Sequence, residues 1–417
     1  MTGSSTIGRD HDPAYEFKAV MLLALGFGLV GVDRWVIAPL APAIMQDLGI
    51  APQQMNNLIA ILGITWGLAS VTMGNLADRL GRRRVLIPAI LIFSLASGLS
   101  GLASGFTSLL IIRAAMGGAE GAFCPASFAA TADAARPDRI GFAQGFQQSM
   151  FALFGLGFGP IIATFLLESY GWRSAFLLVA VPGLVIGLGL WLVIREPVSE
   201  RKATPGESAP AGGLGVALRE VIAQHNVRVG MLALMCAMCG IFVLSANVPI
   251  YLSEYMKLSP INMGLVTSAI GFGGFLGLWT LPSLSDIVGR RTMGIIGFLG
   301  SAGSLWCFIQ TGAEMGYLFA SLFSSSAFAF GLFSLLTGPI AAEGAPSGMI
   351  STTAGLIGGV GEILGGGMAL VIAGAMIASF GIASMLYLAL GGFALGAVVM
   401  LFLHETAPRV IARRGSK

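Results

Sequence analysis

The chain has 417 residues, of which 55% are hydrophobic and only 10% are charged, whereas charged residues make up about 25% of an average soluble domain. This balance excludes a soluble domain and indicates an integral membrane protein. The net charge of +3 is too small to favour binding to nucleic acid, and the 60 glycines suit helices that pack closely in lipid.

Hydrophobic runs bounded by charged residues or Gly/Pro turns predict twelve membrane-spanning helices. Six lie near 19–41, 55–77, 85–104, 107–131, 140–167 and 173–194, and six more lie near 228–251, 261–284, 292–312, 316–341, 349–378 and 381–403. The first run is too long for a cleaved signal segment, so we expect it to remain as a spanning helix.

One long polar segment divides the chain into two halves. We predict a leader at 1–18, a six-helix bundle at 19–194, a linker at 195–227, a second six-helix bundle at 228–404 and a tail at 405–417. Nineteen of the 23 Lys and Arg residues fall in the leader, linker, tail and the loops on their side. The positive-inside rule therefore predicts that both termini are cytoplasmic, as in a bacterial-type inner membrane.

The two halves repeat one sequence pattern at the same place. The loop after the second span, Gly74–Arg84, shares an Asp-x-x-Gly-Arg-Arg core with Pro282–Arg291, the loop after the eighth span, at an offset of 208 residues. Parallel six-helix repeats are typical of transporters whose substrate site lies near the membrane midplane, between the repeats.

The fourth span carries a cation and an anion within an apolar run. Arg113 and Glu120 are seven residues apart, close to two helical turns, so both lie on one face about 10 Å apart along the axis. An ionised side chain at bilayer depth costs about 2.5–3.5 kcal/mol on insertion scales, so these residues are candidates for function. The alternative is that they form internal ion pairs with other helices. Helix rise puts Arg34 of the first span at the level of Arg113, roughly 10 Å from the outer face, and Glu120 near the midplane.

The loop at Gly74–Arg84 resembles the signature of the major facilitator superfamily, and the resemblance covers essentially the whole chain. It implies an all-α membrane protein with twelve helices in two pseudo-symmetric six-helix bundles. It also implies that this loop ties the two halves together when the cavity opens outward and that this contact breaks when the cavity opens inward. The residues so implied are Gly74, Asp78, Arg79, Gly81, Arg82, Asp286, Gly289 and Arg290. A carboxylate at Asp78 is expected to face the positive start of the eleventh span, which would favour it by roughly 0.3–1 kcal/mol.

Two further motifs resemble the anion:cation symporter family. They are Gly31-Val-Asp33-Arg34 in the first span and Arg113-x-x-x-Gly117-x-x-Glu120 in the fourth. The resemblance implies that their charged residues serve anion binding and proton coupling.

Our hypothesis is that Arg34 and Arg113 hold a carboxylate, because guanidinium presents a planar fork of donors to it. Asp33 neutralises the pair when the site is empty, and Glu120, poorly solvated, carries a proton at physiological pH. The function expected is proton-coupled uptake of an organic anion such as a sugar acid, an aromatic acid or a dicarboxylate, by one chain acting as a monomer in the lipid bilayer. The proton gradient is the driving force.

Other residues of the spans have two interpretations each. Glu362 is a second proton site or a substrate contact, or it packs against the backbone of neighbouring glycines. Polar side chains either contact the substrate or join helices; those considered as substrate contacts are Gln147, Gln148, Asn247 and Tyr251. Large rings at Trp66, Trp279 and Phe330 pack against a ligand ring or only against protein.

Two rival functions remain open. Gly155–Pro160 resembles a signature of proton-antiport drug exporters, and lipid carriers of the Spinster type share the Asp-Arg pair and the fourth-helix Arg and Glu. An enzyme is not expected, because the sequence shows no metal-ligand cluster, nucleophile–base set or phosphate loop. We therefore expect no catalytic residues, no metal and no cofactor.

Overall fold

The computed structural model describes residues 12–136, 139–195, 213–346, 349–407 and 410–411, with the backbone alone at 71–72, 74–80, 213–217 and 351. Every regular element in these ranges is a helix. The predicted all-α class is confirmed.

The first half of the chain forms the helices of one bundle. They are α1 (Pro13–Trp35), α2 (Ile37–Leu48), α3 (Pro52–Leu80), α4 (Arg82–Ser100), α5 (Phe106–Ala134), α6 (Ile140–Met150), the π-helical segment η1 (Phe151–Phe158) and α7 (Gly159–Val193). The first span is thus two helices, which meet at Val36. The helix α7 breaks at Gly171 (φ 78°, ψ 165°), so it contains the end of the fifth span and the whole sixth span.

The second half forms the other bundle, after the short helix α8 (Gly213–Ala223). Its elements are α9 (His225–Ile250), η2 (Tyr251–Tyr255), α10 (Pro260–Thr267), α11 (Ala269–Val288), α12 (Arg290–Gln310), α13 (Met315–Thr337), α14 (Pro339–Gly344), α15 (Ile350–Val360), η3 (Gly361–Met368), α16 (Ala369–Phe380) and α17 (Ser384–Met400).

Nine helical stretches of the described residues are long and apolar enough to cross a membrane. One of them, Ile140–Val193, contains two spans because of the break at Gly171. The 29-residue α3 and the 17-residue α17 complete the twelve spans. Most helices extend beyond the predicted bounds because polar turns continue the helix past the apolar run.

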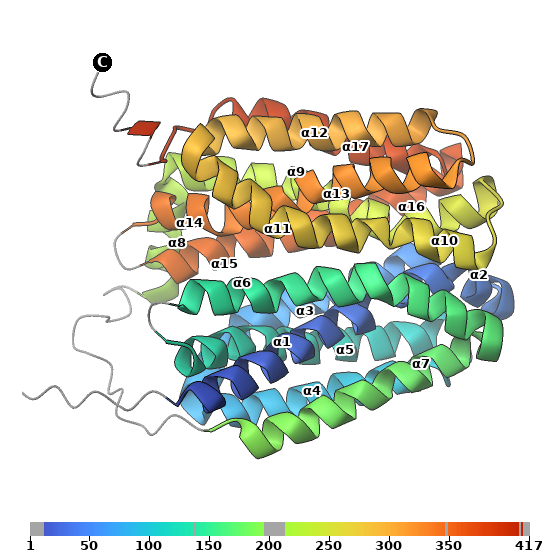
Figure 1. Ribbon diagram of the computed structural model, residues 1–417, viewed down its shortest axis with the longest axis horizontal. Coiled ribbons are helices and arrows are strands. Elements are labelled where there is room, and N and C mark those ends of the chain that lie inside the picture. The colour runs from blue at the N-terminus through green and yellow to red at the C-terminus, as the bar shows by residue number, and fades with distance from the viewer. Residues whose placement is uncertain (1–11, 137–138, 196–212, 347–348, 408–409, 412–417) are drawn as a thin grey trace, which may run out of the picture.

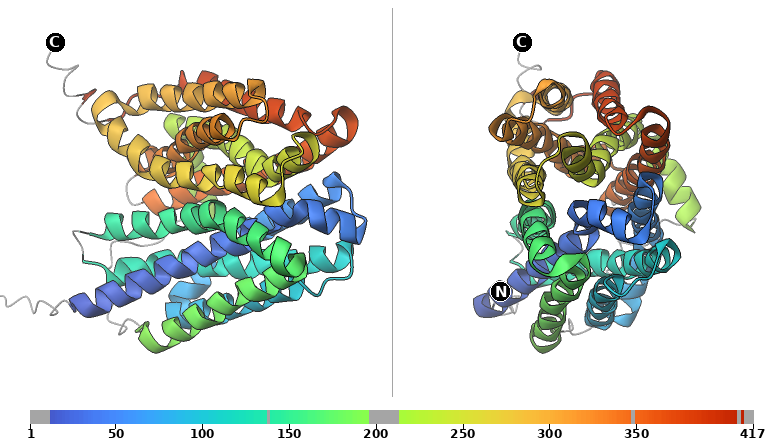
Figure 2. Two further views of the ribbon diagram at one scale, coloured as in Figure 1. Left: turned by 45° about the vertical axis from the view of Figure 1, so that its right-hand side comes forward. Right: turned by 90° about the vertical axis from the view of Figure 1, so that its right-hand side faces the viewer.

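The helices run roughly parallel to one another, in two bundles that lie one above the other (Figures 1 and 2). The end of the molecule at which α1 begins and α17 ends is called the terminal end below. The opposite end carries α2 and α10 (Figure 1). The interface between the bundles runs through the middle of the molecule and positions the site.

The repeat found in the sequence is also present in the backbone. Gly81 and Gly289, the glycines of the two copies of the loop, have φ values of 98° and 111°, which a side chain with a Cβ rarely adopts. The π-helical segments η1 and η3 begin at Phe151 and Gly361, at corresponding places in the fifth and eleventh spans. Segments of this kind inside α-helices frequently mark functional sites.

The two bundles make close contact toward the opposite end. Asn56 of α3 and Asn247 of α9 exchange side-chain hydrogen bonds of 2.9 and 3.0 Å, and both are buried. Gly264 of α10 lies against Thr164 and the carbonyl of Pro160 in α7, so closely that a Cβ at Gly264 would clash with them. Small residues therefore let the bundles meet without a gap there.

Candidate functional site

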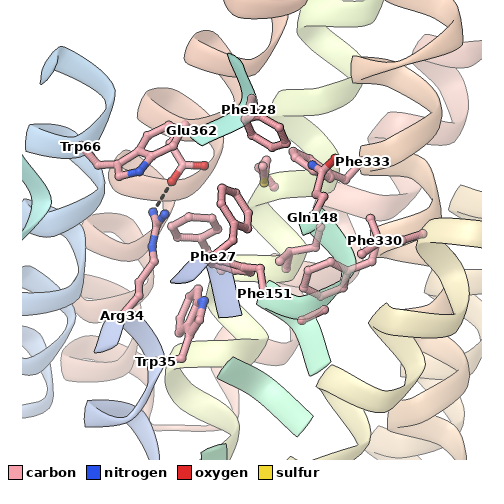
Figure 3. A pocket seen from close by; sticks show the side chains of 15 residues that line it. Phe27, Arg34, Trp35, Trp66, Phe128, Gln148, Phe151, Phe330, Phe333 and Glu362 are labelled. Atoms are coloured by element: carbon pink, nitrogen blue, oxygen red, sulfur yellow. Dashed lines mark hydrogen bonds and ion pairs between the residues drawn. The ribbon is translucent and has the colours of Figure 1, made fainter. Parts of the chain in front are cut away.

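A cavity of about 150 Å³ lies between the two bundles (Figure 3). Its polar side chains are Arg34 of α1, Gln148 of α6 and Glu362 of η3. The rest of the lining is apolar or aromatic, and the eight aromatic residues are Phe27, Trp35, Trp66, Phe128, Phe151, Phe242, Phe330 and Phe333. Both halves of the chain contribute to this wall, as expected for a site at the interface of two repeats.

Arg34 and Glu362 form an ion pair across the interface between the bundles. Arg34 Nη2 donates to Glu362 Oε1, and the two side chains are only 4% and 8% exposed (Figure 3). The guanidinium also lies 5.0 Å from the ring centre of Phe242 and 5.7 Å from that of Trp66. A cation at this depth is thus neutralised by one carboxylate and flanked by aromatic faces.

Glycines make room for this pair. A Cβ at Gly63 of α3 would lie 3.2 Å from Arg34 Nη2 and 4.0 Å from Glu362 Oε1. Within η3, Gly365 packs against the backbone of Met235 and Gly366 against the ring of Phe242, so η3 can approach α9 closely. The glycine-rich sequence around Glu362 therefore packs closely on its neighbour and also carries a cavity residue.

Arg113 lies outside the cavity lining. Its side chain is fully buried, and Nη1 donates to the main-chain carbonyls of Asp33 at 3.1 Å and Arg34 at 3.2 Å. Its guanidinium carbon is 5.9 Å from the ring centre of Phe176. The expected common level of Arg34 and Arg113 is therefore present, but in this structure Arg113 holds the end of α1 and does not face the cavity as the hypothesis required.

Asp33 of α1 and Glu120 of α5 are also fully buried, in the same bundle as Arg34. Neither carboxyl oxygen of Glu120 has a hydrogen-bond partner among the described residues, and Nε and Nη2 of Arg113 have none either. Glu120 interacts electrostatically with all four other charged groups of this region. A buried carboxyl group with this few partners is costly as an anion, so the arrangement suits groups that bind and release protons.

Three other predicted substrate contacts are occupied by protein. Gln147 accepts from Thr131 Oγ1 at 2.6 Å and donates to Ser127, which joins α6 to α5. Asn247 pairs with Asn56, as described above, and Tyr251 is buried with its ring stacked on Tyr255 at 5.0 Å. These side chains contact other protein groups in this structure and do not line the cavity. Gln148 does line it.

The three aromatic residues considered as ligand contacts in the sequence also differ, since some line the cavity and one packs only against protein. Trp66 and Phe330 line the cavity. Trp279 instead packs on Phe142, with ring centres 5.8 Å apart, in the contact between the two bundles.

The loop residues of the repeat make matching contacts at the terminal end. Arg82 pairs with Asp133 of α5 and donates to the carbonyl of Ala129 at 2.6 Å. Arg290 pairs with Glu343 of α14 at 2.8 Å and with Asp286 at 2.7 Å. At Gly74, Asp78 and Arg79 only the backbone is described, so the predicted contact of the Asp78 side chain with the eleventh span lies outside the described residues.

Two features of the site were missed by the sequence analysis. The first is the partnership of Arg34 with Glu362, which are 328 residues apart in the chain. The second is the extent of the aromatic wall, including Phe27 and Phe151. The only signal for the pair was that each residue is charged within an apolar span. No group of three or more His, Cys, Asp or Glu that could hold a metal occurs within the described residues.

Comparison with known proteins places the chain in one family. The family model described as "Major Facilitator Superfamily" matches residues 23–369. A hexuronate transporter of Bacillus subtilis is 27% identical over 282 residues, which cover 66% of each chain. The multidrug resistance protein MdtG of Escherichia coli is 26% identical and covers 74% of this chain and 77% of its own.

A solved structure has the same fold. It is an inward-facing, unoccupied bacterial homologue of the human lysosomal transporter Spinster, with a TM-score of 0.76 and 18% identity, covering 94% of this chain and 95% of its own.

Proposed function

Because this chain is a transporter of the Major Facilitator Superfamily, we propose that it carries a small organic anion together with protons by alternating access. The observation that carries the proposal is the Arg34–Glu362 pair in a cavity between the two bundles. The B. subtilis relative, a hexuronate transporter, supports an anionic substrate.

The pair supplies a mechanism for coupling. In the empty carrier, Glu362 neutralises Arg34 at bilayer depth. A substrate carboxylate competes for the same guanidinium, which binds carboxylates through a fork of donors. Glu362 then loses its cation and takes up a proton, because a lone buried carboxylate is costly. One negative charge and one proton enter together, so the net charge of the cavity stays the same in the empty and loaded carrier.

Other charged residues of the N-terminal bundle, near Arg34 but outside the cavity lining, support this exchange. We assign Glu120 as a further proton site, since both of its oxygens are buried and have no hydrogen-bond partner among the described residues. Arg113 positions Arg34 through the two main-chain carbonyls, and both Glu120 and Asp33 interact electrostatically with Arg113. This assignment replaces the earlier expectation that both arginines contact the anion.

Orientation follows from the loop charges. We place the terminal end on the cytoplasmic side of a bacterial-type inner membrane. The outer side then carries the contact between Asn56 and Asn247 and the contact between Gly264 and Thr164. In this arrangement the route from the outside is closed. Opening it requires α3 to part from α9, and α7 from α10, as expected when two rigid repeats rock about a central site.

Uptake into proteoliposomes tests the proposal. Wild-type carrier should accumulate a carboxylate more rapidly under an inward proton gradient than without one. Glu362→Gln should retain counterflow exchange but lose the response to the gradient. Glu254→Gln, at an exposed carboxylate of η2, is the matched control and should behave as wild type. Unchanged gradient dependence in Glu362→Gln, with normal folding, would refute the role of the pair.

Uptake into vesicles with a proton gradient also distinguishes the proposed symport from two rival functions. These are suggested by the names of two similar proteins, a multidrug resistance protein and a Spinster homologue. A drug exporter takes up its substrate into inside-out vesicles when the lumen is acidic, whereas the proposed symporter takes up its anion when the outside is acidic. A lipid carrier shows no saturable uptake of a water-soluble acid in either case.

A further inference from the structure

We propose that the substrate is a small aromatic monocarboxylate, with its carboxylate on Arg34 and its ring against the aromatic wall. This inference rests on the proposed function and narrows it to one class of acid. It follows from three properties of the cavity, which are the wall, the number of cations and the position of Gln148.

The wall is suited to a flat, apolar ring. Phe27 and Phe151 lie 6.0 Å apart between their ring centres, and Phe330 approaches the same space from α13 (Figure 3). Aromatic rings attract one another in offset or edge-to-face arrangements, which adds to the burial of apolar area. A cavity of about 150 Å³ admits a ring of the size of benzene.

The number of cations limits the charge of the ligand. Among the described residues, Arg34 is the only cationic side chain in the lining of this cavity, and Glu362 already balances it. A second carboxylate on the ligand would face the rings of the wall without a partner, which disfavours dicarboxylates. A sugar acid has the same difficulty in a milder form, because its hydroxyls need partners that phenylalanine side chains do not offer.

The guanidinium of Arg34 and the neighbouring indole of Trp35 have donors without an acceptor. Nε of Arg34 and Nε1 of Trp35 are buried and have no acceptor among the described residues. The guanidinium carbon lies 6.0 Å from the ring centre of Trp35, and both residues line the cavity. They can complete the hydrogen bonds of a carboxylate that displaces Glu362.

Arg34 of α1 and Gln148 of α6 both line the cavity, and Figure 3 shows them on different sides of it. Within the described residues no hydrogen bond of the Gln148 amide is found. It is placed to meet a polar group at the far side of a ring, such as a hydroxyl opposite the carboxylate. The pose therefore predicts that 4-hydroxybenzoate binds more tightly than benzoate.

A matched set of acids tests the class. The melting temperature of the purified full-length carrier is measured with benzoate, 4-hydroxybenzoate, cyclohexanecarboxylate, glucuronate and succinate at one concentration. We expect stabilisation by the two aromatic acids and none by glucuronate or succinate. Phe330→Leu should weaken benzoate binding about tenfold, and Phe319→Leu, on the same helix but outside the cavity lining, should not. Gln148→Leu should remove the preference for 4-hydroxybenzoate over benzoate.

Each contrary outcome has one meaning. Stabilisation by glucuronate or succinate but not benzoate, when lost in Arg34→Lys, would overturn the aromatic class and leave the anion site standing. Equal binding of cyclohexanecarboxylate and benzoate would overturn the role of the ring. Stabilisation by no acid of the set, or stabilisation unaffected by Arg34→Lys, would instead overturn the proposed anion site itself. If Phe330→Leu fails to fold, Phe27→Leu tests the same wall from α1.

Discussion

The two bundles share a backbone but differ in their buried charges. Gly81 and Gly289 adopt the same unusual conformation, and a π-helical segment interrupts the fifth and the eleventh spans at corresponding places. Near the cavity, however, the N-terminal bundle buries four charged side chains, whereas the C-terminal bundle contributes Glu362. Symmetry of the fold is thus combined with asymmetry of the chemistry.

This difference indicates how the work is divided. A symmetric backbone is what two rigid bundles need in order to rock about a central site. Ion binding and proton binding need no such symmetry. The N-terminal bundle provides four of the charged side chains near the cavity, and the C-terminal bundle provides Glu362, which pairs with Arg34 across the interface.

The largest effect is expected at Arg34, where the two bundles meet electrostatically. Arg34→Ala leaves Glu362 without its cation, and loss of one partner of a buried pair costs about 3–5 kcal/mol, so uptake should fall by about 100-fold or more. Arg34→Lys restores charge without the fork of donors and should recover only part of the activity. Uptake in proteoliposomes measures both.

The control is an ion pair within the N-terminal bundle. Arg173 pairs with Asp47, and both side chains are nearly half exposed. Arg173→Ala should leave uptake within about twofold of wild type, because exposed pairs contribute only about 0.2–1 kcal/mol. An equal loss in the two variants would show that the position of Arg34 in the cavity is unimportant.

A second prediction compares the repeated loops. Arg290 is 6% exposed and Arg82 is 20% exposed, and each is paired with a carboxylate of its own bundle. Arg290→Ala should therefore lower the free energy of unfolding by about 3 kcal/mol, as for a buried pair. Arg82→Ala should lower it by about 1 kcal/mol, nearer the value for exposed pairs. Melting of the detergent-solubilised carrier measures the difference, and equal losses would contradict the prediction.

The third prediction concerns Glu120, which has no counterpart among the described charged residues of the other bundle near the cavity. Glu120→Gln keeps the shape of the side chain but cannot exchange a proton. Acceleration of uptake by the proton gradient should fall about tenfold, while counterflow exchange persists, as expected for a residue that acts in proton transfer. A gradient response equal to that of wild type would remove Glu120 from the account.

The smallest effect is expected at the contact between the bundles. Asn56→Ala removes the hydrogen bonds to Asn247, which are worth about 1 kcal/mol, and should raise the population open at the opposite end about fivefold. Spin labels at positions 51 and 261 report this opening as a longer distance. Asn262→Ala, in α10, is the control, and a distance distribution unchanged in Asn56→Ala would contradict the assigned role.

Much of the fold could be predicted from the sequence. Hydropathy and Gly/Pro turns located all twelve spans, because a bilayer fixes the length of a spanning helix. The Asp-x-x-Gly-Arg-Arg repeat predicted two equivalent halves. The sequence did not reveal the break of the first span at Val36 or the π-helical segments, because these depend on how closely neighbouring helices pack.

The site was predicted only in part, for a physical reason. The charged residues were found because charge is costly in an apolar span. Helix rise then gave the depth of each one, but depth does not determine which way a long side chain turns. Arg113 turns to main-chain carbonyls, and Arg34 reaches across the interface to Glu362. Contacts between residues this distant in the chain require the tertiary structure.

The central claim is that a substrate carboxylate replaces Glu362 on Arg34 while Glu362 takes up a proton. Calorimetry of benzoate binding in buffers of different ionisation enthalpy measures this proton directly. About one proton should be taken up per anion bound near pH 7, affinity should rise as pH falls, and Glu362→Gln should bind benzoate without this proton. Benzoate binding with no proton uptake by the wild-type carrier, or with the same uptake in Glu362→Gln, would contradict it.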